Sequence, residues 1–230
     1  MSRLYLFAEG QTEQTFADTV LMQHLANHGV YMHNPVLIAH GRKKGKVHRG
    51  GGRSFVAMQN DIIRFLKQES GVDVFFTTMI DLYALHNSFP GAEEAEKIRH
   101  LPYERVQMLE EEWAKATGDH RFIPFIQLHE FEAYLFANVP ELSFFYDDAE
   151  TEIAALQAVA DGVETPELIN DGQQTAPSKR IITQFPDYKD AKTTVGPQAA
   201  ELVGLPAIRS KCPHFDGWLK RLEGLGGNEE

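Results

Sequence analysis

Acidic side chains follow three strand-like apolar runs in this sequence. Residues 4–8 precede Glu9, residues 72–80 precede Asp81, and residues 121–128 precede His129, Glu130 and Glu132. Because the carboxyl ends of parallel strands meet at one edge of a sheet, we expect these acids to lie close together. Carboxylates crowded there repel one another unless a cation lies between them, and such hard oxygen ligands suit Mg²⁺ or Mn²⁺. The pattern therefore predicts a metal site of the kind that supports phosphoryl transfer.

Glu9 and Asp81 are the first candidates for metal ligands, because each directly ends a predicted strand. Glu130 and Glu132 can supply further oxygen ligands from the neighbouring strand end, and Glu13, one helical turn after Glu9, can reach the same region. The alternative for each acid is a turn or a helix cap, which is a common structural role for an acid beside a helix start.

The backbone conformation of residues 128–132 determines which of the side chains of His129, Glu130 and Glu132 lie on the same side. If it stays extended, Glu130 and Glu132 lie on one side. If a helix begins at His129, then His129 and Glu132 share a face. His129 is a candidate proton shuttle, since histidine ordinarily titrates near neutrality, and the alternative is a structural histidine bonded to a carboxylate. The sequence leaves both pairs of alternatives open.

Six cationic side chains gather between residues 40 and 53, a stretch called the basic segment below. They are Arg42, Lys43, Lys44, Lys46, Arg49 and Arg53, and no acid lies among them. The formal net charge of the chain is -11, so the remainder is strongly acidic. Three successive glycines let the main chain approach a ligand, which suits this predicted loop to holding a DNA or RNA backbone. The alternative is a surface connection without a partner.

The composition is that of an ordinary globular protein, with 230 residues of which 43% are hydrophobic and 24% charged. No apolar run is long enough for a membrane span, and the N-terminus lacks a signal-peptide pattern. The single cysteine, Cys212, excludes an intrachain disulfide. We therefore expect a cytoplasmic protein.

Short apolar runs alternate with helical patterns over the first 130 residues, which is typical of βαβ units and a mainly parallel sheet. Strands are predicted at residues 4–8, 35–39, 72–81 and 121–128, and helices at 12–27, 54–68, 103–116 and 131–138. Thr12 is expected to cap the first helix, and the glutamates at 110–112 to face solvent. We predict a three-layer α/β core over residues 1–140 and a helical extension over 141–230, packed together as one unit. Within the extension, short helices are predicted at 149–160, 178–185 and 196–203.

Six sequence blocks in order resemble DUF4276, a bacterial family with a Toprim-like core. The blocks are residues 9–13 (EGQTE), 79–83 (MIDLY), 89–91 (FPG), 102–105 (PYER), 122–132 (FIPFIQLHEFE) and 212–215 (CPHF). Residues 7–13 also resemble the first motif of Toprim nuclease domains of the overcoming-lysogenization-defect (OLD) type, and Asp81 resembles their second acidic strand end. The resemblance implies a Toprim-like fold, a nuclease of phage defence and an ATPase partner that controls it.

One departure from the Toprim pattern concerns the second acidic strand end. Toprim enzymes usually carry two aspartates separated by one residue, whereas this chain reads Asp81-Leu82-Tyr83. The leading expectation is Mg²⁺-dependent cleavage of DNA or RNA, with Glu9, Glu13, Asp81, His129, Glu130 and Glu132 at the site. The alternative is a non-catalytic subunit that binds nucleic acid or a partner protein.

Overall fold

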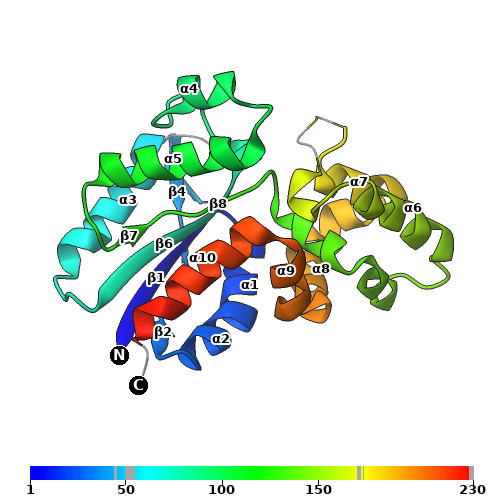
Figure 1. The fold of residues 1–230 in the computed structure, drawn as a ribbon, viewed down its shortest axis with the longest axis horizontal. Helices are drawn as coiled ribbons and strands as arrows, with labels where there is room; N and C mark the ends of the chain where they lie inside the picture. The colour runs from blue at the N-terminus through cyan, green and yellow to red at the C-terminus, as the bar shows by residue number, and fades with distance from the viewer. Residues whose placement is uncertain (44–45, 50–54, 170–171, 173, 228–230) are drawn as a thin grey trace.

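A parallel sheet forms the centre of the molecule (Figure 1). The computed structural model describes residues 1–43, 46–49, 55–169, 172 and 174–227. The six strands are β1 (Ser2–Ala8), β2 (Val30–Met32), β3 (Val36–Leu37), β6 (Val74–Asp81), β7 (Phe122–Ile123) and β8 (Ile126–Gln127). β1 and β6 pair at the centre, β2 and β3 extend the β1 side, and β7 and β8 extend the β6 side, with every pair parallel.

Helices cover both faces of the sheet and make three layers. One face packs on α3 (Phe55–Gln68) and α5 (Pro102–Thr117), and the other on α1 (Gln11–Phe16), a π-helical turn (Ala17–Leu21), α2 (Met22–Ala26) and α10 (Pro213–Glu223). Side chains alternate along β1 as a pleated strand requires: Leu4, Leu6 and Ala8 join the α1 and α10 side, whereas Phe7 joins the α3 and α5 side. The predicted α/β class is confirmed, and the arrangement agrees with a Toprim-like core.

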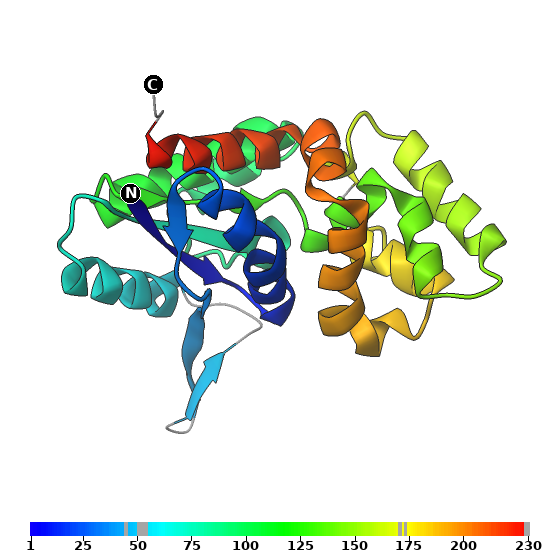
Figure 2. The ribbon, with the colours of Figure 1, turned by 90° about the horizontal axis from the view of Figure 1, so that it is seen from below.

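The remaining helices form a lobe beside the sheet (Figure 2). They are α6 (Glu150–Asp161), α7 (Pro177–Gln184), α8 (Tyr188–Val203) and α9 (Leu205–Lys211), with short 3₁₀ helices at Phe131–Ala137, Val139–Phe144 and Pro166–Leu168. α8 approaches α1 closely at Gly196, where a Cβ atom would lie 3.2 Å from the methyl carbon of Thr12. Buried residues of the lobe and of β1 belong to one continuous hydrophobic cluster, so the helical part shares a core with the sheet.

The structure differs from the sequence-based prediction in several elements. The basic segment was predicted to be a loop, but β4 (Ala39–Lys43) and β5 (Lys46–Arg49) pair as an antiparallel hairpin. Lys44 and Arg53 lie outside the described residues. The predicted fourth strand is divided into β7 and β8 around Pro124, because proline cannot donate to a strand ladder.

Two further differences concern helices. The first helix begins at Gln11 with Gly10 as its N-cap, so Thr12 is buried inside the first turn rather than acting as the cap. A helix that was not predicted, α4 (Ala92–Lys97), lies in the connection between β6 and α5. Across the described residues, none of the helices combines the length and apolar character needed to cross a lipid bilayer.

Helix α10 completes the core from the far end of the chain. Trp218 is 5% exposed, its ring stacks on Phe125 with centroids 4.3 Å apart, and its indole N–H donates to Thr77 Oγ1 at 2.9 Å. α10 therefore holds one face of the sheet through apolar contact and a buried hydrogen bond.

Trp218→Ala should lower the free energy of unfolding by about 3–5 kcal/mol, because it opens a cavity against the sheet. Trp218→Phe keeps a stacked ring and loses mainly the hydrogen bond, so about 1 kcal/mol is expected. Urea unfolding measures both values. The control is Leu202→Ala on α8, since Leu202 is 39% exposed. If Trp218→Ala costs no more than this control, α10 is not part of the folded core.

Candidate metal centre

Glu9 and Asp81 meet at the carboxyl edge of the sheet. The register pairs Ala8 of β1 with Met79 of β6, so the two strands end almost level. The backbone N–H of Asp81 donates to Glu9 Oε2 at 2.8 Å. Both residues are partly buried. The two acids that the sequence placed at strand ends therefore lie in one neighbourhood.

Glu13 points back toward this edge from the first turn of α1. Its Oε2 accepts the backbone N–H of Gly10 at 2.9 Å, and the residue is only 5% exposed. Burial, together with the charges of Glu9 and Glu132, raises the pKa of Glu13 to about 7. Glu13 can therefore exchange a proton near neutral pH.

The first residue of the 3₁₀ helix that follows β8 holds Asp81 in place. Its Oδ1 accepts the backbone N–H of Phe131 at 3.0 Å. Burial and the neighbouring charges of Glu13 and Glu9 raise the pKa of Asp81 well above its ordinary value. A cation next to these groups would favour their charged forms and reverse that shift.

The turn between β8 and the next 3₁₀ helix follows neither of the two backbone alternatives that the sequence left open. His129 has a left-handed conformation with φ of 65°, Glu130 is extended, and the 3₁₀ helix begins at Phe131. His129 is 6% exposed, and its carbonyl accepts the backbone N–H of Tyr83 at 3.1 Å. The turn thus buries His129 and Glu130 directly before Phe131, whose backbone N–H holds Asp81.

Glu130 and Glu132 have different partners. Glu130 Oε2 accepts the backbone N–H of Ser178 at 2.9 Å, at the N-terminus of α7, where helix amides favour an anion. Glu132 is fully buried, and its Oε1 contacts both the hydroxyl of Tyr188 at 3.1 Å and the ammonium of Lys192 at 3.0 Å. Its other oxygen, Oε2, is buried and has no hydrogen-bond partner.

Lys192 is a charged member of the site that sequence reasoning missed. Burial opposes its charge, but Glu132, Asp81 and Glu130 outweigh that effect and raise the pKa of Lys192 above its usual range. The sequence signal was weak: Tyr188 and Lys192 lie four residues apart on one helix face, but the predicted helix began only at residue 196.

The donor set fits a hard divalent cation. Glu9, Asp81 and Glu132 offer carboxylate oxygens, and the buried, unpartnered Glu132 Oε2 is an atom that a bound ion would satisfy. In the part of the chain that the structure describes, however, these acids do not place three ligand oxygens within 4.8 Å of one another. The position of the second Toprim aspartate is occupied by Tyr83, which is 45% exposed.

The basic segment starts at the same edge of the sheet. β3 pairs with the last two residues of β1, Phe7 and Ala8, and the backbone N–H of Ile38 donates to the carbonyl of Ala8 at 3.0 Å. β4 begins at the next residue, and the hairpin projects away from the sheet (Figure 2). The chain therefore carries Arg42, Lys43, Lys46 and Arg49 on a hairpin that leaves the sheet beside Glu9.

The sequence matches one protein family over nearly its whole length. The pattern of DUF4276, described as a domain of unknown function, covers residues 8–223. The chain belongs to this family. No curated protein matches the sequence significantly.

Among solved structures, the DUF4276 chain is similar to the C-terminal region of the Xanthomonas campestris pv. campestris OLD protein. The identity is 14% and the TM-score 0.38, and the alignment covers 96% of this chain and 98% of the other. Because both values are low, the roles of the site residues rest on the contacts described above.

The buried acids should make stability depend on pH. Native Glu13 keeps its proton up to about pH 7, whereas an unfolded glutamate releases it near 4.5. Between these values the native chain binds more protons than the unfolded chain, so the free energy of unfolding should fall as pH rises through this window. Urea unfolding at several pH values measures the slope, and Glu13→Gln should reduce it.

Mg²⁺ adds a second readout to that experiment. Because a cation pairs with ionised carboxylates, Mg²⁺ should stabilise the protein more at about pH 8 than at about pH 5.5. If the free energy of unfolding of wild type equals that of Glu13→Gln at every pH, the environment assigned to Glu13 is contradicted.

Lys192 should be needed to keep Glu132 buried. Lys192→Met leaves a buried carboxylate without its cation and should cost about 3 kcal/mol of unfolding free energy near neutral pH. The double variant Glu132→Gln with Lys192→Met removes both charges and should recover much of that loss. Lys189→Met, at an exposed position of the same helix, is the control. Equal effects of the two lysine variants would show that the ion pair contributes nothing.

Proposed function

We propose that this DUF4276 protein is a Mg²⁺- or Mn²⁺-dependent nuclease that hydrolyses phosphodiester bonds of DNA or RNA. The observation that carries the proposal is the meeting of Glu9 and Asp81 at adjoining strand ends, joined by the 2.8 Å hydrogen bond from Asp81 N–H to Glu9 Oε2. A hairpin rich in lysine and arginine leaves the sheet at the same edge. Acids for a metal and cations for phosphates thus come from one edge of one sheet.

Each side chain has a role in this proposal. Glu9, Asp81 and Glu132 would hold the metal, which when bound would polarise the scissile phosphate and acidify a water molecule. Glu13, a buried carboxyl next to Glu9, would be ionised once the metal is bound and is then suited to accept a proton from the attacking water. Glu130, anchored on α7, orients the turn, and His129 lies beside it as a further proton carrier.

The substrate would be held by the basic segment. Its cations would contact the phosphate backbone without reading sequence, so binding should weaken as salt rises. Following the resemblance to OLD-type nucleases, we further propose a role in phage defence in the cytoplasm, with an ATPase partner that controls cleavage.

A second candidate function is a non-catalytic subunit that binds nucleic acid or a partner protein. Two observations favour it: Tyr83 stands where a Toprim enzyme has its second aspartate, and Lys192 already supplies a cation to Glu132. In that case the strand-end acids would form an internal ion-pair network, and the basic segment alone would contact the nucleic acid or the partner protein.

Purified protein should cleave DNA or RNA when Mg²⁺ or Mn²⁺ is added, and EDTA should abolish cleavage. Glu9→Gln and Asp81→Asn should each lower the rate by at least about a hundredfold, because each replaces an anionic carboxylate ligand with a neutral amide that binds the metal more weakly. Glu201→Gln, at an exposed position of α8, should retain full activity. Gel electrophoresis of labelled substrate measures the rate, with and without candidate ATPase partners.

The outcome separates the two functions. Metal-dependent cleavage lost in Glu9→Gln supports the nuclease. Nucleic-acid binding of equal strength in wild type and Glu9→Gln, with no cleavage under any of these conditions, would replace it with the non-catalytic subunit.

A further inference from the structure

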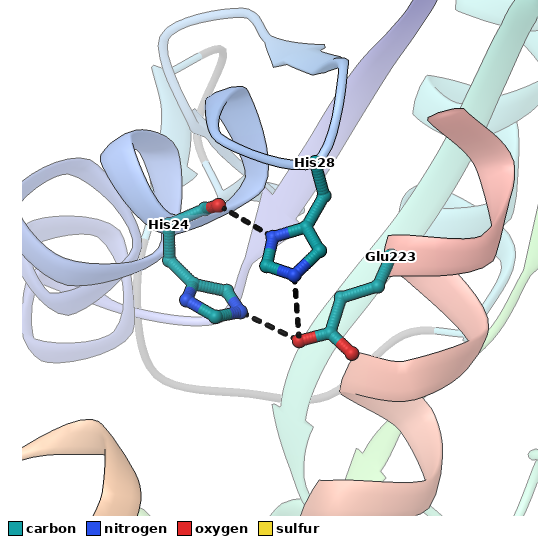
Figure 3. Close-up of side chains that lie close together, drawn as sticks. All are labelled: His24, His28 and Glu223. Carbon is teal, nitrogen blue, oxygen red and sulfur yellow. Dashed lines mark hydrogen bonds and ion pairs between the residues drawn. The ribbon is translucent and has the colours of Figure 1, made fainter. Parts of the chain in front are cut away.

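Two histidines and a glutamate form a separate cluster at the opposite end of the sheet (Figure 3). His24 lies in α2, His28 lies in the turn after it, and Glu223 is the last residue of α10. One ligand atom from each lies within 4.8 Å of the others, and within the described chain these three residues are the group that meets this criterion. His24 and Glu223 are partly buried, whereas His28 is exposed.

This cluster lies far from the acids at the strand ends. The backbone N–H of Ser2, at the start of β1, donates to the carbonyl of Gly29 at 3.2 Å, next to His28. Glu9 follows the other end of the same strand. Because a strand rises about 3.3 Å per residue, the two sites are about 20 Å apart along β1.

The backbone holds α2 and α10 tightly together at the cluster. Gly226, just beyond α10, packs so closely on the His28 backbone that a Cβ atom would lie 1.8 Å from the His28 carbonyl oxygen. Ser2 Oγ also donates to the carbonyl of Leu225. These contacts with the main chain fix the ends of both helices. They therefore hold Glu223 next to the two imidazoles.

The hydrogen bonds prepare His28 as a ligand. Its Nδ1 lies 3.0 Å from the carbonyl oxygen of His24, and since a carbonyl only accepts, Nδ1 carries the proton. When the ring is neutral, the lone pair is therefore on Nε2, which lies 4.0 Å from Glu223 Oε1. A ligand histidine that donates its other N–H to a backbone carbonyl is the usual arrangement in protein metal sites.

The distances are close to those of a tetrahedral metal site. Ligand atoms about 2.0–2.2 Å from one Zn²⁺ lie about 3.3 Å from each other in a tetrahedron. Here Glu223 Oε1 is 2.6 Å from His24 Nε2 and 4.0 Å from His28 Nε2. Changes of about 0.7 Å in each separation would bring both to the tetrahedral value. The His28 side chain is 42% exposed, which gives its ring room to rotate.

Arg209 is the competing cation. Its guanidinium contacts both oxygens of Glu223, with Nη2 3.2 Å from Oε2 and Nη1 on Oε1, while Nε binds Asp216 at 2.6 Å. Releasing Oε1 to a metal leaves Arg209 bound to Oε2 and to Asp216, so Glu223 would stay oriented. Beside the cluster, His24 and Arg209 line an open pocket with Leu205, Pro206, Ser210 and Asp216.

We propose that His24, His28 and Glu223 bind a divalent transition metal of the Zn²⁺ class, with water completing the coordination. The bound metal would link the end of α10 to α2. Two imidazoles and one carboxylate are borderline ligands that suit Zn²⁺ rather than Mg²⁺. The site is independent of the proposed nuclease chemistry, because it shares no residue with the acids at the strand ends.

Isothermal titration with Zn²⁺ tests the proposal on the full chain, freed of metal by EDTA and dialysis. Wild type should bind one equivalent of Zn²⁺ at this site, and Zn²⁺ should raise the melting temperature. His28→Ala should weaken binding at least tenfold, and because His28 is 42% exposed, this variant should fold normally. His100→Ala, which removes an exposed histidine elsewhere, should bind as wild type does.

Visible absorption of bound Co²⁺ gives a readout that does not depend on stability, since its d–d bands report the coordination geometry of the ion directly. The absorption should appear in wild type and in Glu9→Gln and be lost in His28→Ala. Absence of bound Zn²⁺ in wild type, or equal affinity in wild type and His28→Ala, would overturn the proposal. Binding lost in Glu9→Gln but kept in His28→Ala would place the ion at the strand-end acids and overturn it equally.

Discussion

Repulsion among carboxylates at one edge of a parallel sheet is the constraint on which this structure depends. Most of the acids there accept a hydrogen bond from a backbone amide, which for Glu9, Asp81 and Glu130 belongs to a distant segment. The donor and acceptor pairs are Asp81 N–H to Glu9, Gly10 N–H to Glu13, Phe131 N–H to Asp81, and Ser178 N–H to Glu130. Glu132, which is fully buried, instead pairs with Lys192 and Tyr188. The charges are therefore distributed among fixed dipoles rather than neutralised one by one.

This constraint makes the helical lobe part of the site. The predicted division at residue 140 separates the strand-end acids from Ser178, Tyr188 and Lys192, which hold two of them. α8 can reach the cluster because Gly196 lets it pack directly against α1. A chain without residues 141–230 would lose the Ser178 amide that holds Glu130 and the Tyr188 and Lys192 side chains that hold Glu132.

The sequence predicted the elements whose signal is local. Apolar runs that end on an acid located β1 and β6, and parallel pairing then brought Glu9 and Asp81 together. Contacts between distant segments carry no such signal. Lys192 is one charge on a helix whose N-terminal half was not predicted, and Glu110, expected to face solvent, accepts the backbone N–H of Ile126 at 2.8 Å.

The basic segment shows the same limit for backbone structure. Its glycines and lysines are poor strand formers, and the pattern favoured a loop. Strand pairing between β4 and β5 depends on two short stretches meeting after the chain leaves β3, which residue preferences do not encode. Proline at position 124 was visible in the sequence, but the strand pairing that resumes after it at β8 was not.

The balance of charge around Asp81 bears on whether the cluster is catalytic. Five carboxylates, from Glu9, Glu13, Asp81, Glu130 and Glu132, share the positive charge of Lys192 within the described part of the site, and that charge lies directly on Glu132. A purely structural network would gain from further lysines or from replacing acids with apolar residues, because unneutralised buried carboxylates destabilise a fold. Burial, together with the neighbouring carboxylates, raises the pKa of Asp81 and of Glu13, so without a metal bound, protons offset part of that charge. We propose that a bound cation offsets this excess when the site is occupied, and hard carboxylate oxygens on strand ends would select Mg²⁺ or Mn²⁺ for that role.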